Sequence, residues 1–344
     1  MSGGFAGSFQ VGKALLDWLS RSVAFTVAVG LAVGMCASAC AQSKAPQRPT
    51  LPKGFVAEYD VAYVPDGDEA QRLDIYYPEQ APEKPLPLLI WIHGGGWSAG
   101  SKSQMPYLSQ LPRGYAAASL EYRFSQKAKF PAQIQDCQAA IRWLRANAAK
   151  YHLDSARFGV GGGSAGGHLA ALVGTSGGKN TFPKIGGHDD QSDRVQAVCD
   201  IYGPTNFWTV IKQAEDDKAV KNIFKWNQGD PYSKLIGARL GEDKAACDAV
   251  SPVTYVSADN PPFLILHGDR DTLVPYAQSV ELAERLEKAG VSTVLQRLPG
   301  AGHGGPLFTA PPVLNLATAF FDKHLQGRDV EVKAIDPATL APAK

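Results

Sequence analysis

The chain has no excess of charge of either sign. Lys and Arg total 34 and Asp and Glu total 33 among its 344 residues, so the formal net charge at pH 7 is +1. Binding to nucleic acid needs basic side chains that neutralise phosphates, so we expect no nucleic-acid partner. Hydrophobic residues make up 44% of the chain and charged residues only 19%, which excludes a disordered chain and predicts a large globular core.

Cysteine is scarce, and its spacing excludes two kinds of site. No two of the five cysteines form a Cys-x-x-Cys pair, so the chain lacks the pattern of a zinc ribbon or of a redox motif. Two of the five lie near the N-terminus, and the others are Cys137, Cys199 and Cys247. We expect these three to be buried thiols. The alternative is a disulfide between Cys199 and Cys247, which would close the base of the segment between them.

A hydrophobic run long enough to cross a membrane is also missing. The longest candidate, Val23–Ala37, has about 15 residues, whereas a span needs about 20. It ends in small residues with the pattern Ala39-Cys40-Ala41, which is typical of a signal-peptide cleavage site. We therefore expect residues 1–41 to be a signal peptide, residues 42–54 to be a linker, and the protein to be exported to the periplasm or beyond, with no stable span after processing. The alternatives are an uncleaved anchor and a lipid attached to Cys40.

Short apolar strands alternate with amphipathic helices along most of the chain. This order predicts a mostly parallel sheet covered by helices on both faces, with functional residues at the carboxyl ends of the strands. We expect one catalytic domain over residues 55–327, followed by a poorly ordered tail over residues 328–344. The expected strands are 55–64, 73–77, 86–92, 115–120, 158–161, 195–201, 263–266 and 291–298, and the expected helices are 132–149, 165–174, 276–289 and 312–325.

One segment, residues 205–247, interrupts this alternation without a strand of its own. It carries aromatic residues among many charged ones, namely Phe207, Trp208, Phe224 and Trp226. We expect a helical cap over the sheet in which Phe207, Trp208 and Trp226 contact substrate. The alternative is a helical excursion whose aromatic side chains only anchor it to the domain.

The strongest motif is Gly-Gly-Ser-Ala-Gly over residues 162–166. It has the form Gly-x-Ser-x-Gly, follows an expected strand and opens an expected helix. A serine at the apex of such a sharp turn is exposed, and the helix N-terminus brings positive charge near it. We expect Ser164 to be a nucleophile. A phosphate-binding loop is the competing interpretation, but no Gly-Lys-Ser/Thr sequence follows.

A glycine run follows the strand over residues 86–92. Glycines bring the backbone close to a substrate and turn its N–H groups inward, which a developing oxyanion requires. We expect the amides of Gly95 and Gly96, with that of Ala165, to form an oxyanion hole. We expect His93 to be structural, and we include the neighbouring Trp97 among the residues that contact substrate.

Two later loops complete a serine triad. Asp271 follows the strand over residues 263–266, and His303 lies in a glycine-rich loop after the last strand. His303 would remove the Ser164 proton, while a carboxylate fixes its tautomer. Asp269 is the alternative acid, but it directly follows the strand end, where we expect it to bond local backbone amides.

These motifs together resemble the α/β-hydrolase esterases. They are Trp-Ile-His-Gly-Gly-Gly-Trp over residues 91–97, Gly-Gly-Ser-Ala-Gly-Gly over 162–167, and His-Gly-Asp-Arg-Asp-Thr-Leu-Val-Pro over 267–275. The chain is most similar to the BD-FAE-like group, the feruloyl and acetyl-xylan esterase-like proteins that neighbour the hormone-sensitive lipase family. The resemblance implies an α/β-hydrolase fold with a cap and makes Asp271 the catalytic acid. Lipases of the neighbouring family usually carry an acidic residue before the serine, where this chain has Gly163, so the carbohydrate-esterase side is favoured.

The resemblance implies a secreted serine carboxylesterase. Its substrates would be short-chain or aromatic acyl esters, as small molecules or on plant or other polysaccharides. The sequence has no flavin, nicotinamide or metal motif, so we expect no cofactor. One alternative is a peptidase of the prolyl-oligopeptidase type, but that family has an aromatic residue where this chain has Ala165. Another is a non-catalytic binding module, which would usually have lost one residue of the triad.

Overall fold

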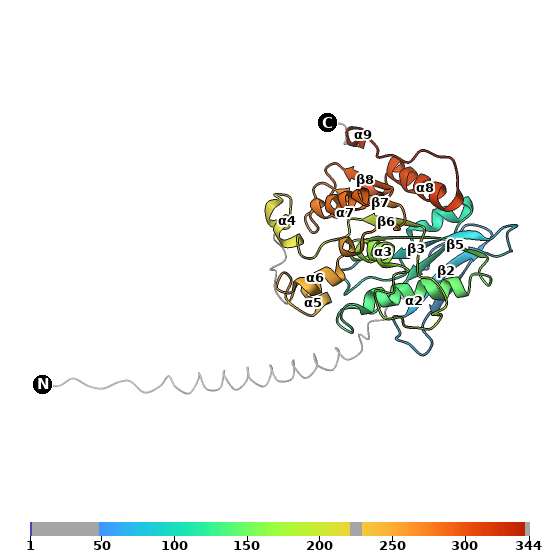
Figure 1. Cartoon of the computed structure of the whole chain (residues 1–344), viewed down its shortest axis with the longest axis horizontal. Helices are drawn as coiled ribbons and strands as arrows, with labels where there is room; N and C mark the ends of the chain where they lie inside the picture. The colour runs from blue at the N-terminus through green and yellow to red at the C-terminus, as the bar shows by residue number, and fades with distance from the viewer. Residues whose placement is uncertain (2–47, 221–228, 341–344) are drawn as a thin grey trace. The chain divides into compact units, whose positions relative to one another are not determined.

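An eight-stranded sheet forms the centre of the part of the chain that the computed structural model describes, which is Met1, residues 48–220 and residues 229–340 (Figure 1). The order across the sheet is β1-β2-β4-β3-β5-β6-β7-β8. Strands β1 and β2 pair antiparallel, as do β2 and β4, and the remaining pairs are parallel. The bounds are β1 Phe55–Ala62, β2 Arg72–Pro78, β3 Leu86–Ile92, β4 Ala116–Leu120, β5 Leu153–Gly163, β6 Ala197–Ile201, β7 Phe263–Gly268 and β8 Thr293–Leu298.

Helices cover both faces of this sheet, because alternate residues of the central strands point to opposite sides. In β3, Leu88 and Ile90 belong to the core cluster that includes apolar residues of α2, α3 and α7, whereas Leu89 belongs to the cluster that includes residues of η1 and α8. The helices are α2 Ala132–Ala146, α3 Ala165–Ser176, α4 Val210–Asp216, α5 Pro231–Ile236, α6 Lys244–Val250, α7 Tyr276–Lys288, α8 Pro311–Gln326 and α9 Pro337–Leu340, with the 3-10 helices η1 Pro106–Arg113, η2 Pro252–Tyr255 and η3 Pro306–Thr309.

The predicted fold class is confirmed by this arrangement, and the elements differ from the expected ones mainly at their ends. The strand expected over residues 158–161 runs from Leu153 to Gly163, and the helix expected over 132–149 ends at Ala146. From β3, the chain adds β4 on one side of the sheet and then β5 and β6 on the other side. At such a reversal of strand order, an open α/β sheet provides a crevice, and here the carboxyl ends of β3 and β5 flank it.

The C-terminal tail was expected to be poorly ordered, and this is wrong for residues 328–340. Val332 and Ile335 pack against the core cluster beside α8, and Leu340 is buried. The Ile335 amide donates a hydrogen bond of 2.6 Å to Gln296 Oε1 on β8. Apolar residues spaced along a polar segment therefore fix it against the edge of the sheet.

The alternative disulfide between Cys199 and Cys247 is also wrong. Both thiols are free and buried, as is that of Cys137. Cys199 lies on β6 in the cluster beside η1 and α8, whereas Cys247 lies on α6 in the cluster on the opposite face. The two cysteines flank the same insertion in the sequence, but they belong to cores on opposite faces of the sheet.

Residues 2–41 of the predicted signal peptide, with the Cys40 lipid site, and residues 42–47 of the predicted linker lie outside the described residues. Within residues 48–220 and 229–340, no helix combines the length and the apolar character that a membrane span needs.

Candidate active site

Ser164 lies at a sharp turn between β5 and α3. Its backbone φ is 57° and ψ is −122°, a conformation that residues with a side chain rarely adopt. Gly166 allows this turn because a Cβ there would lie 2.0 Å from the Ile92 carbonyl oxygen. A Cβ at Gly162 would lie 2.3 Å from the Gly166 oxygen. The two glycines of the motif thus let the end of β3 approach the start of α3.

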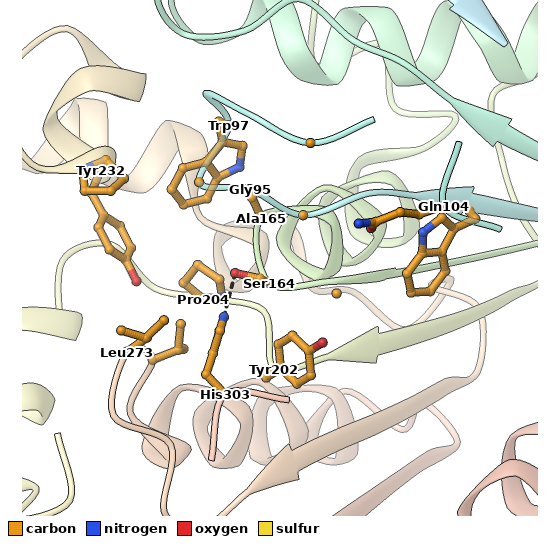
Figure 2. Close-up of a pocket in the computed structure, with 17 residues that line it drawn as sticks. Gly95, Trp97, Gln104, Ser164, Ala165, Tyr202, Pro204, Tyr232, Leu273 and His303 are labelled. Atoms are coloured by element: carbon orange, nitrogen blue, oxygen red, sulfur yellow. Dashed lines mark hydrogen bonds between the residues drawn. The ribbon is translucent and has the colours of Figure 1, made fainter. Parts of the chain in front are cut away.

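A continuous line of hydrogen bonds joins Ser164, His303 and Asp271 (Figure 2 shows the first of them). Ser164 Oγ lies 2.8 Å from His303 Nε2, and His303 Nδ1 lies 2.7 Å from Asp271 Oδ2. With Nδ1 donating to the carboxylate, Nε2 is the ring atom that accepts the serine proton. The His303 side chain is 15% exposed and that of Asp271 is fully buried, so the proton-accepting ring faces the cavity while its acid is shielded from water.

Asp271 is held as a carboxylate by donors on every side. Its Oδ1 accepts the amides of Leu273 and Val274 at 2.8 and 3.0 Å, and its Oδ2 lies 3.2 Å from His267 Nε2. Burial alone would raise the pKa of Asp271, but the hydrogen bonds from His267 and His303 outweigh it and hold that pKa well below its usual range. This carboxylate can therefore stabilise a positive charge on His303.

Asp269 and His267 support the acid loop without touching Ser164. Asp269 Oδ1 accepts the Gly300 amide at 2.7 Å and its Oδ2 lies 3.3 Å from Arg297 Nε, so it joins the loops after β7 and β8. His267 is fully buried, with Nδ1 2.7 Å from Ser279 Oγ. Asp269 thus accepts a backbone amide, but from the loop after β8 rather than from its own loop as expected.

The glycine loop after β3 lines the cavity beside Ser164. Gly95 and Gly96 line the cavity and have φ values of 113° and 59°. The Gly95 carbonyl accepts the amides of Ser98 and Ala99, which closes the loop tightly. Ala165 is the first residue of α3, where helix amides have no acceptor within the helix. The three residues expected to form the oxyanion hole therefore line one cavity, and His93 braces the glycine loop through Nδ1, 2.7 Å from the Gly94 oxygen.

His168 links this loop to the insertion. Its Nδ1 accepts a hydrogen bond of 3.1 Å from Trp97 Nε1, so its protonated Nε2 donates to the Val250 carbonyl oxygen at 2.8 Å. Burial lowers the pKa of His168 to about 4, which keeps the ring neutral at physiological pH. The oxyanion loop, α3 and the end of α6 are thus joined through one imidazole.

The cavity beside Ser164 has a volume of about 440 Å³. Of the expected substrate contacts, Trp97 lines it. Phe207 does not, because its fully buried ring packs 5.6 Å from that of Trp97 and 5.0 Å from that of Tyr232. Trp208 is 40% exposed and lies outside the lining, and Trp226 and Phe224 lie outside the described residues. The expectation of substrate contact is therefore wrong for the fully buried Phe207, whereas contact by the exposed Trp208 stays a prediction.

Other lining residues were missed by sequence reasoning. They are Trp91, Gln104, Tyr202, Pro204, Pro231, Tyr232, Leu273 and Val274 (Figure 2 labels several of them). Tyr202 directly follows β6, so its place at the carboxyl end of a central strand was a usable signal. Gln104 lies in a loop and Pro231 begins α5, and neither segment carries a motif.

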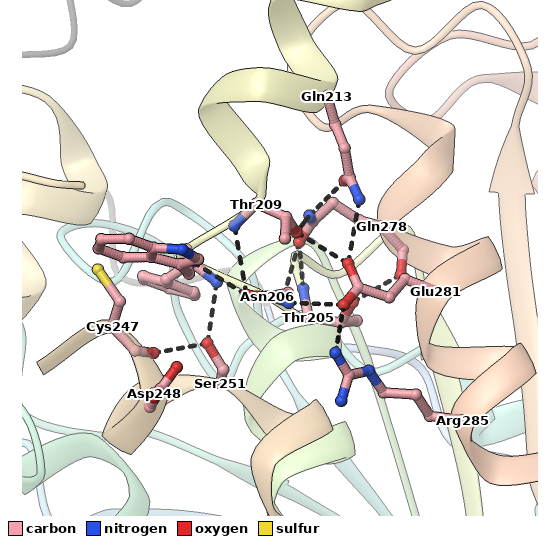
Figure 3. A network of polar contacts seen from close by, with 12 residues as sticks. Thr205, Asn206, Thr209, Gln213, Cys247, Asp248, Ser251, Gln278, Glu281 and Arg285 are labelled. Atoms are coloured by element: carbon pink, nitrogen blue, oxygen red, sulfur yellow. Dashed lines mark hydrogen bonds and ion pairs between the residues drawn. The ribbon is translucent and has the colours of Figure 1, made fainter. Parts of the chain in front are cut away.

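The insertion is anchored at its start by a polar network with α7 (Figure 3). Gln278, fully buried on α7, accepts the amides of Thr205 and Asn206 through Oε1 at 2.7 and 2.8 Å and donates to Gln213 Oε1 on α4 at 2.6 Å. Glu281 accepts hydrogen bonds from Asn206 Nδ2 at 2.6 Å and from Thr209 Oγ1 at 2.8 Å. Each of these buried groups is paired, so the network fixes one position for the start of the insertion.

Asp200 is a fully buried carboxyl at the end of β6, and its pH dependence can be measured. Its Oδ1 accepts the Gly203 amide at 3.0 Å, and within residues 48–220 and 229–340 its Oδ2 has no hydrogen-bond partner. Burial raises the pKa of Asp200 to about 7, despite the opposing hydrogen bond from Gly203. The folded protein therefore keeps a proton between about pH 4 and 7 that the unfolded chain has lost, and stability falls as pH rises through that range.

Asp200→Asn is expected to raise the free energy of unfolding at pH 8 by roughly 2–4 kcal/mol, since each pKa unit corresponds to about 1.4 kcal/mol. The gain should shrink to less than about 1 kcal/mol near pH 4, where the aspartate is protonated in the folded protein and about half protonated in the unfolded chain. Urea denaturation of both proteins at the two pH values measures the difference. An equal gain at both, or a less stable variant at pH 8, would contradict this account.

Metal ions have no evident site here, because the described residues contain no group of three or more His, Cys, Asp or Glu side chains arranged to hold one.

Known proteins resemble this chain in both sequence and fold. The BD-FAE family model matches residues 73–286. Esterase LipC of Mycobacterium tuberculosis is 35% identical over 69% of this chain and 57% of its own length, and Esterase LipQ of the same organism is 33% identical over 71% and 56%. The chain thus spans less than two thirds of the length of these relatives.

Solved structures of known proteins also resemble this chain. A truncated carbohydrate esterase from gut microbiota has a TM-score of 0.73 and 31% identity, covering 81% of this chain and all of that one. An acetyl ester-xyloside bifunctional hydrolase from Caldicellulosiruptor lactoaceticus has a TM-score of 0.53 and 27% identity, covering 74% of this chain and 85% of that one. The sheet, the serine turn and these matches confirm the predicted resemblance: the fold is the α/β-hydrolase fold, and the chain belongs to the BD-FAE family.

Proposed function

We propose that the protein is a serine carboxylesterase in which Ser164 is the nucleophile, His303 the general base and Asp271 the residue that orients it. The observation that carries this proposal is the line of hydrogen bonds from Asp271 through His303 to Ser164, which ends at a cavity lined by Gly95, Gly96 and Ala165. A nucleophile, a base with a fixed tautomer and nearby amide donors are the parts that acyl transfer needs.

The first half of the reaction forms an acyl-enzyme. Ser164 Oγ attacks the ester carbonyl carbon while His303 Nε2 takes the hydroxyl proton. The carbonyl oxygen becomes an oxyanion that accepts hydrogen bonds from the amides of Gly95, Gly96 and Ala165. The intermediate collapses as the bond to the alcohol oxygen breaks, and His303 gives its proton to the departing alcohol.

The second half releases the acid. His303 Nε2 removes a proton from water, whose oxygen attacks the acyl carbon, and the same amides hold the second oxyanion. The bond to Ser164 Oγ then breaks and the serine regains its proton. Because the Asp271 carboxylate stays ionised, it stabilises the imidazolium in both halves and does not itself accept a proton.

We further propose that the substrates are short-chain or aromatic acyl esters of carbohydrates and that the protein is exported. Two proteins of similar structure are a carbohydrate esterase and an acetyl ester-xyloside bifunctional hydrolase. The cavity offers aromatic rings from Trp91 and Tyr202 and the exposed amide of Gln104, groups that suit a sugar ring and its hydroxyls. Export is supported by the signal-peptide pattern over residues 1–41.

An acyl-chain series is expected to show a preference for short acyl groups. Activity on 4-nitrophenyl esters should fall at least about tenfold from acetate or butyrate to decanoate, because the walls of a site that fits short acyl groups must shift to hold extra methylenes, at a cost of about 1–3 kcal/mol. The protein should also release acetate from acetylated xylo-oligosaccharides. The measurements are kcat/KM for each aryl ester and acetate release from the oligosaccharide. Activity that rises with chain length would indicate a lipase, and activity on aryl acetate without release from the oligosaccharide would refute the carbohydrate assignment.

A further inference from the structure

His93 directly follows β3, and both nitrogens of its fully buried ring face oxygen atoms. Nδ1 lies 2.7 Å from the Gly94 carbonyl oxygen, and Nε2 lies 2.7 Å from Oε1 of Glu121, the residue after β4. A carbonyl oxygen and a carboxylate oxygen can only accept hydrogen bonds. A neutral imidazole has one proton to donate, so one of its nitrogens would face an acceptor with a lone pair. A ring that carries both protons, an imidazolium, satisfies both contacts.

Glu121 carries the negative charge that balances such a ring. Its side chain is 18% exposed, and its Oε2 accepts the Lys102 amide at 3.2 Å. The Lys102 ammonium group pairs with other acids, since its Nζ lies 2.6 Å from Asp60 Oδ1 and 3.0 Å from Asp74 Oδ1. In the part of the chain that the structure describes, His93 is therefore the only basic side chain that pairs with Glu121.

Tyr122 stacks on the His93 ring. The two ring centres are 4.6 Å apart and the ring planes are inclined by only 14°. The Tyr122 hydroxyl also donates a hydrogen bond of 3.1 Å to the His93 carbonyl oxygen, which fixes the two residues to each other. Because the face of an aromatic ring attracts a cation, this stacking favours the charged form of the imidazole.

The hydrogen bond from His93 reaches the expected oxyanion hole through one peptide group. The Gly94 carbonyl and the Gly95 amide belong to the same planar unit, in which the nitrogen shares electrons with the carbonyl. A donor on the oxygen therefore makes the N–H of that unit a stronger donor, as hydrogen bonds in a chain polarise one another. A charged donor forms a bond roughly twice as strong as a neutral one. Gly95 lines the cavity beside Ser164.

The backbone at Gly100 packs directly on this hydrogen bond. A Cβ there would lie 2.3 Å from the Gly94 oxygen and 2.3 Å from His93 Nδ1. The contact is thus covered by protein on that side, and a hydrogen bond shielded from water is electrostatically stronger than an exposed one.

Resting on the proposed function, we propose that Glu121 holds His93 as an imidazolium and that this charge strengthens the hydrogen bond from the Gly95 amide to the oxyanion. The negative charge on the substrate oxygen develops only as Ser164 attacks, so the effect stabilises the transition state more than the bound ester. His93 is a positioning residue rather than a catalytic one, because neither it nor Glu121 lines the cavity beside Ser164.

Glu121→Gln tests the charge while keeping the size of the side chain. The glutamine NH₂ group can donate to His93 Nε2, so a neutral ring keeps its hydrogen bond to the Gly94 oxygen. We expect kcat on 4-nitrophenyl acetate to fall about tenfold with KM within about twofold of wild type, a smaller loss than the 10²–10³ that follows removal of an oxyanion donor. Glu58→Gln on β1 is the matched control, because it removes a carboxylate that pairs with Lys150 outside the cavity lining, and kcat should stay near wild type.

Two further measurements separate the charge from simple packing. A trifluoromethyl ketone accepts Ser164 Oγ at its carbonyl carbon and forms an oxyanion, while His303 takes the serine proton. Its inhibition constant should rise in Glu121→Gln by the factor by which kcat falls, and should not change in Glu58→Gln. NMR spectroscopy of ¹⁵N-labelled histidine should show both ring nitrogens of His93 protonated at pH 7 in the wild-type protein and only one in Glu121→Gln. The His93 signal is assigned by its loss in His93→Asn.

A neutral His93 in the wild-type protein would overturn the proposal, whether or not Glu121→Gln folds, which thermal unfolding checks. An unchanged kcat in a folded Glu121→Gln would also overturn it. So would a loss of kcat with an unchanged inhibition constant, since the ion pair would then only support packing. Wild-type protein that neither hydrolyses 4-nitrophenyl acetate nor binds the ketone would contradict the proposed function itself, although the NMR signal would still show whether the His93 ring is charged.

Discussion

Replacing Ser164 by alanine is expected to lower kcat for ester hydrolysis by about 10⁶, because loss of a serine nucleophile leaves only binding and oxyanion stabilisation. His303 Nε2, now 2.8 Å from the place of the missing oxygen, has no proton to accept. The measurement is the steady-state rate on 4-nitrophenyl acetate for both proteins. A binding module, by contrast, would show no difference between them.

The serine variant needs a control for folding and a direct test of the reacting atom. Alanine at the strained φ of 57° is not expected to unfold the turn, since serine already carries a Cβ there, and thermal unfolding checks this. An aryl phosphonate should add to Ser164 in the wild-type protein and leave the variant unlabelled, which mass spectrometry of the peptide measures. Activity within tenfold of wild type, or labelling of another residue, would remove Ser164 from the proposed role.

Asp271→Asn is expected to lower kcat by about 10⁴, as loss of the correct histidine tautomer does in serine triads. Asparagine can turn its NH₂ group towards His303 Nδ1, which then becomes an acceptor and leaves the proton on Nε2, the atom that faces Ser164. Nε2 could no longer accept the serine proton. The loss should appear in kcat more than in KM, because substrate does not contact the buried acid.

Asp269→Asn is the matched control for this change. Asp269 lies two residues before Asp271, but it contacts the Gly300 amide and Arg297 rather than His303. Asparagine keeps an acceptor for that amide, so the expected loss of kcat is less than about tenfold. The ion pair with Arg297, which the substitution removes, is of a kind that contributes only about 0–1 kcal/mol to stability at a protein surface. A milder loss in Asp271→Asn than in Asp269→Asn would reverse the assignment of the acid.

The residues around Ser164 could be predicted because each follows a strand. Parallel strands bring their carboxyl ends to one edge, so a serine turn, a glycine run and an acidic loop at three strand ends must lie near one another. The Gly-x-Ser-x-Gly pattern added a local requirement, since only glycine fits where Gly166 approaches Ile92. The motif and the topology together were therefore enough to predict that Ser164, Asp271 and His303 lie in one site.

The substrate contacts could not be predicted in the same way. Phe207 and Trp208 are adjacent aromatic residues, yet one is fully buried and the other is 40% exposed. That difference depends on which of the two side chains faces Trp97 and Tyr232, and the amino-acid composition of the segment does not specify this. The Cys199–Cys247 bridge was wrong for a related reason, because closeness in topology does not say on which face of the sheet a side chain lies.

The His168 link also has a consequence for redesign by segment exchange. Its Nε2–H needs the Val250 carbonyl as an acceptor, and its Nδ1 needs the Trp97 side chain as a donor. The contacts of this imidazole therefore depend on the backbone position at residue 250 and on the identity of the side chain at residue 97. An insertion transplanted from a relative would fit only if its last helix ended in register with Val250. A one-residue slip would leave a neutral imidazole N–H unpaired in the core, and the misfit would reach Trp97 beside the reacting serine. Chimeras are therefore best joined before residue 244, so that α6 and the Val250 carbonyl stay with the parent domain.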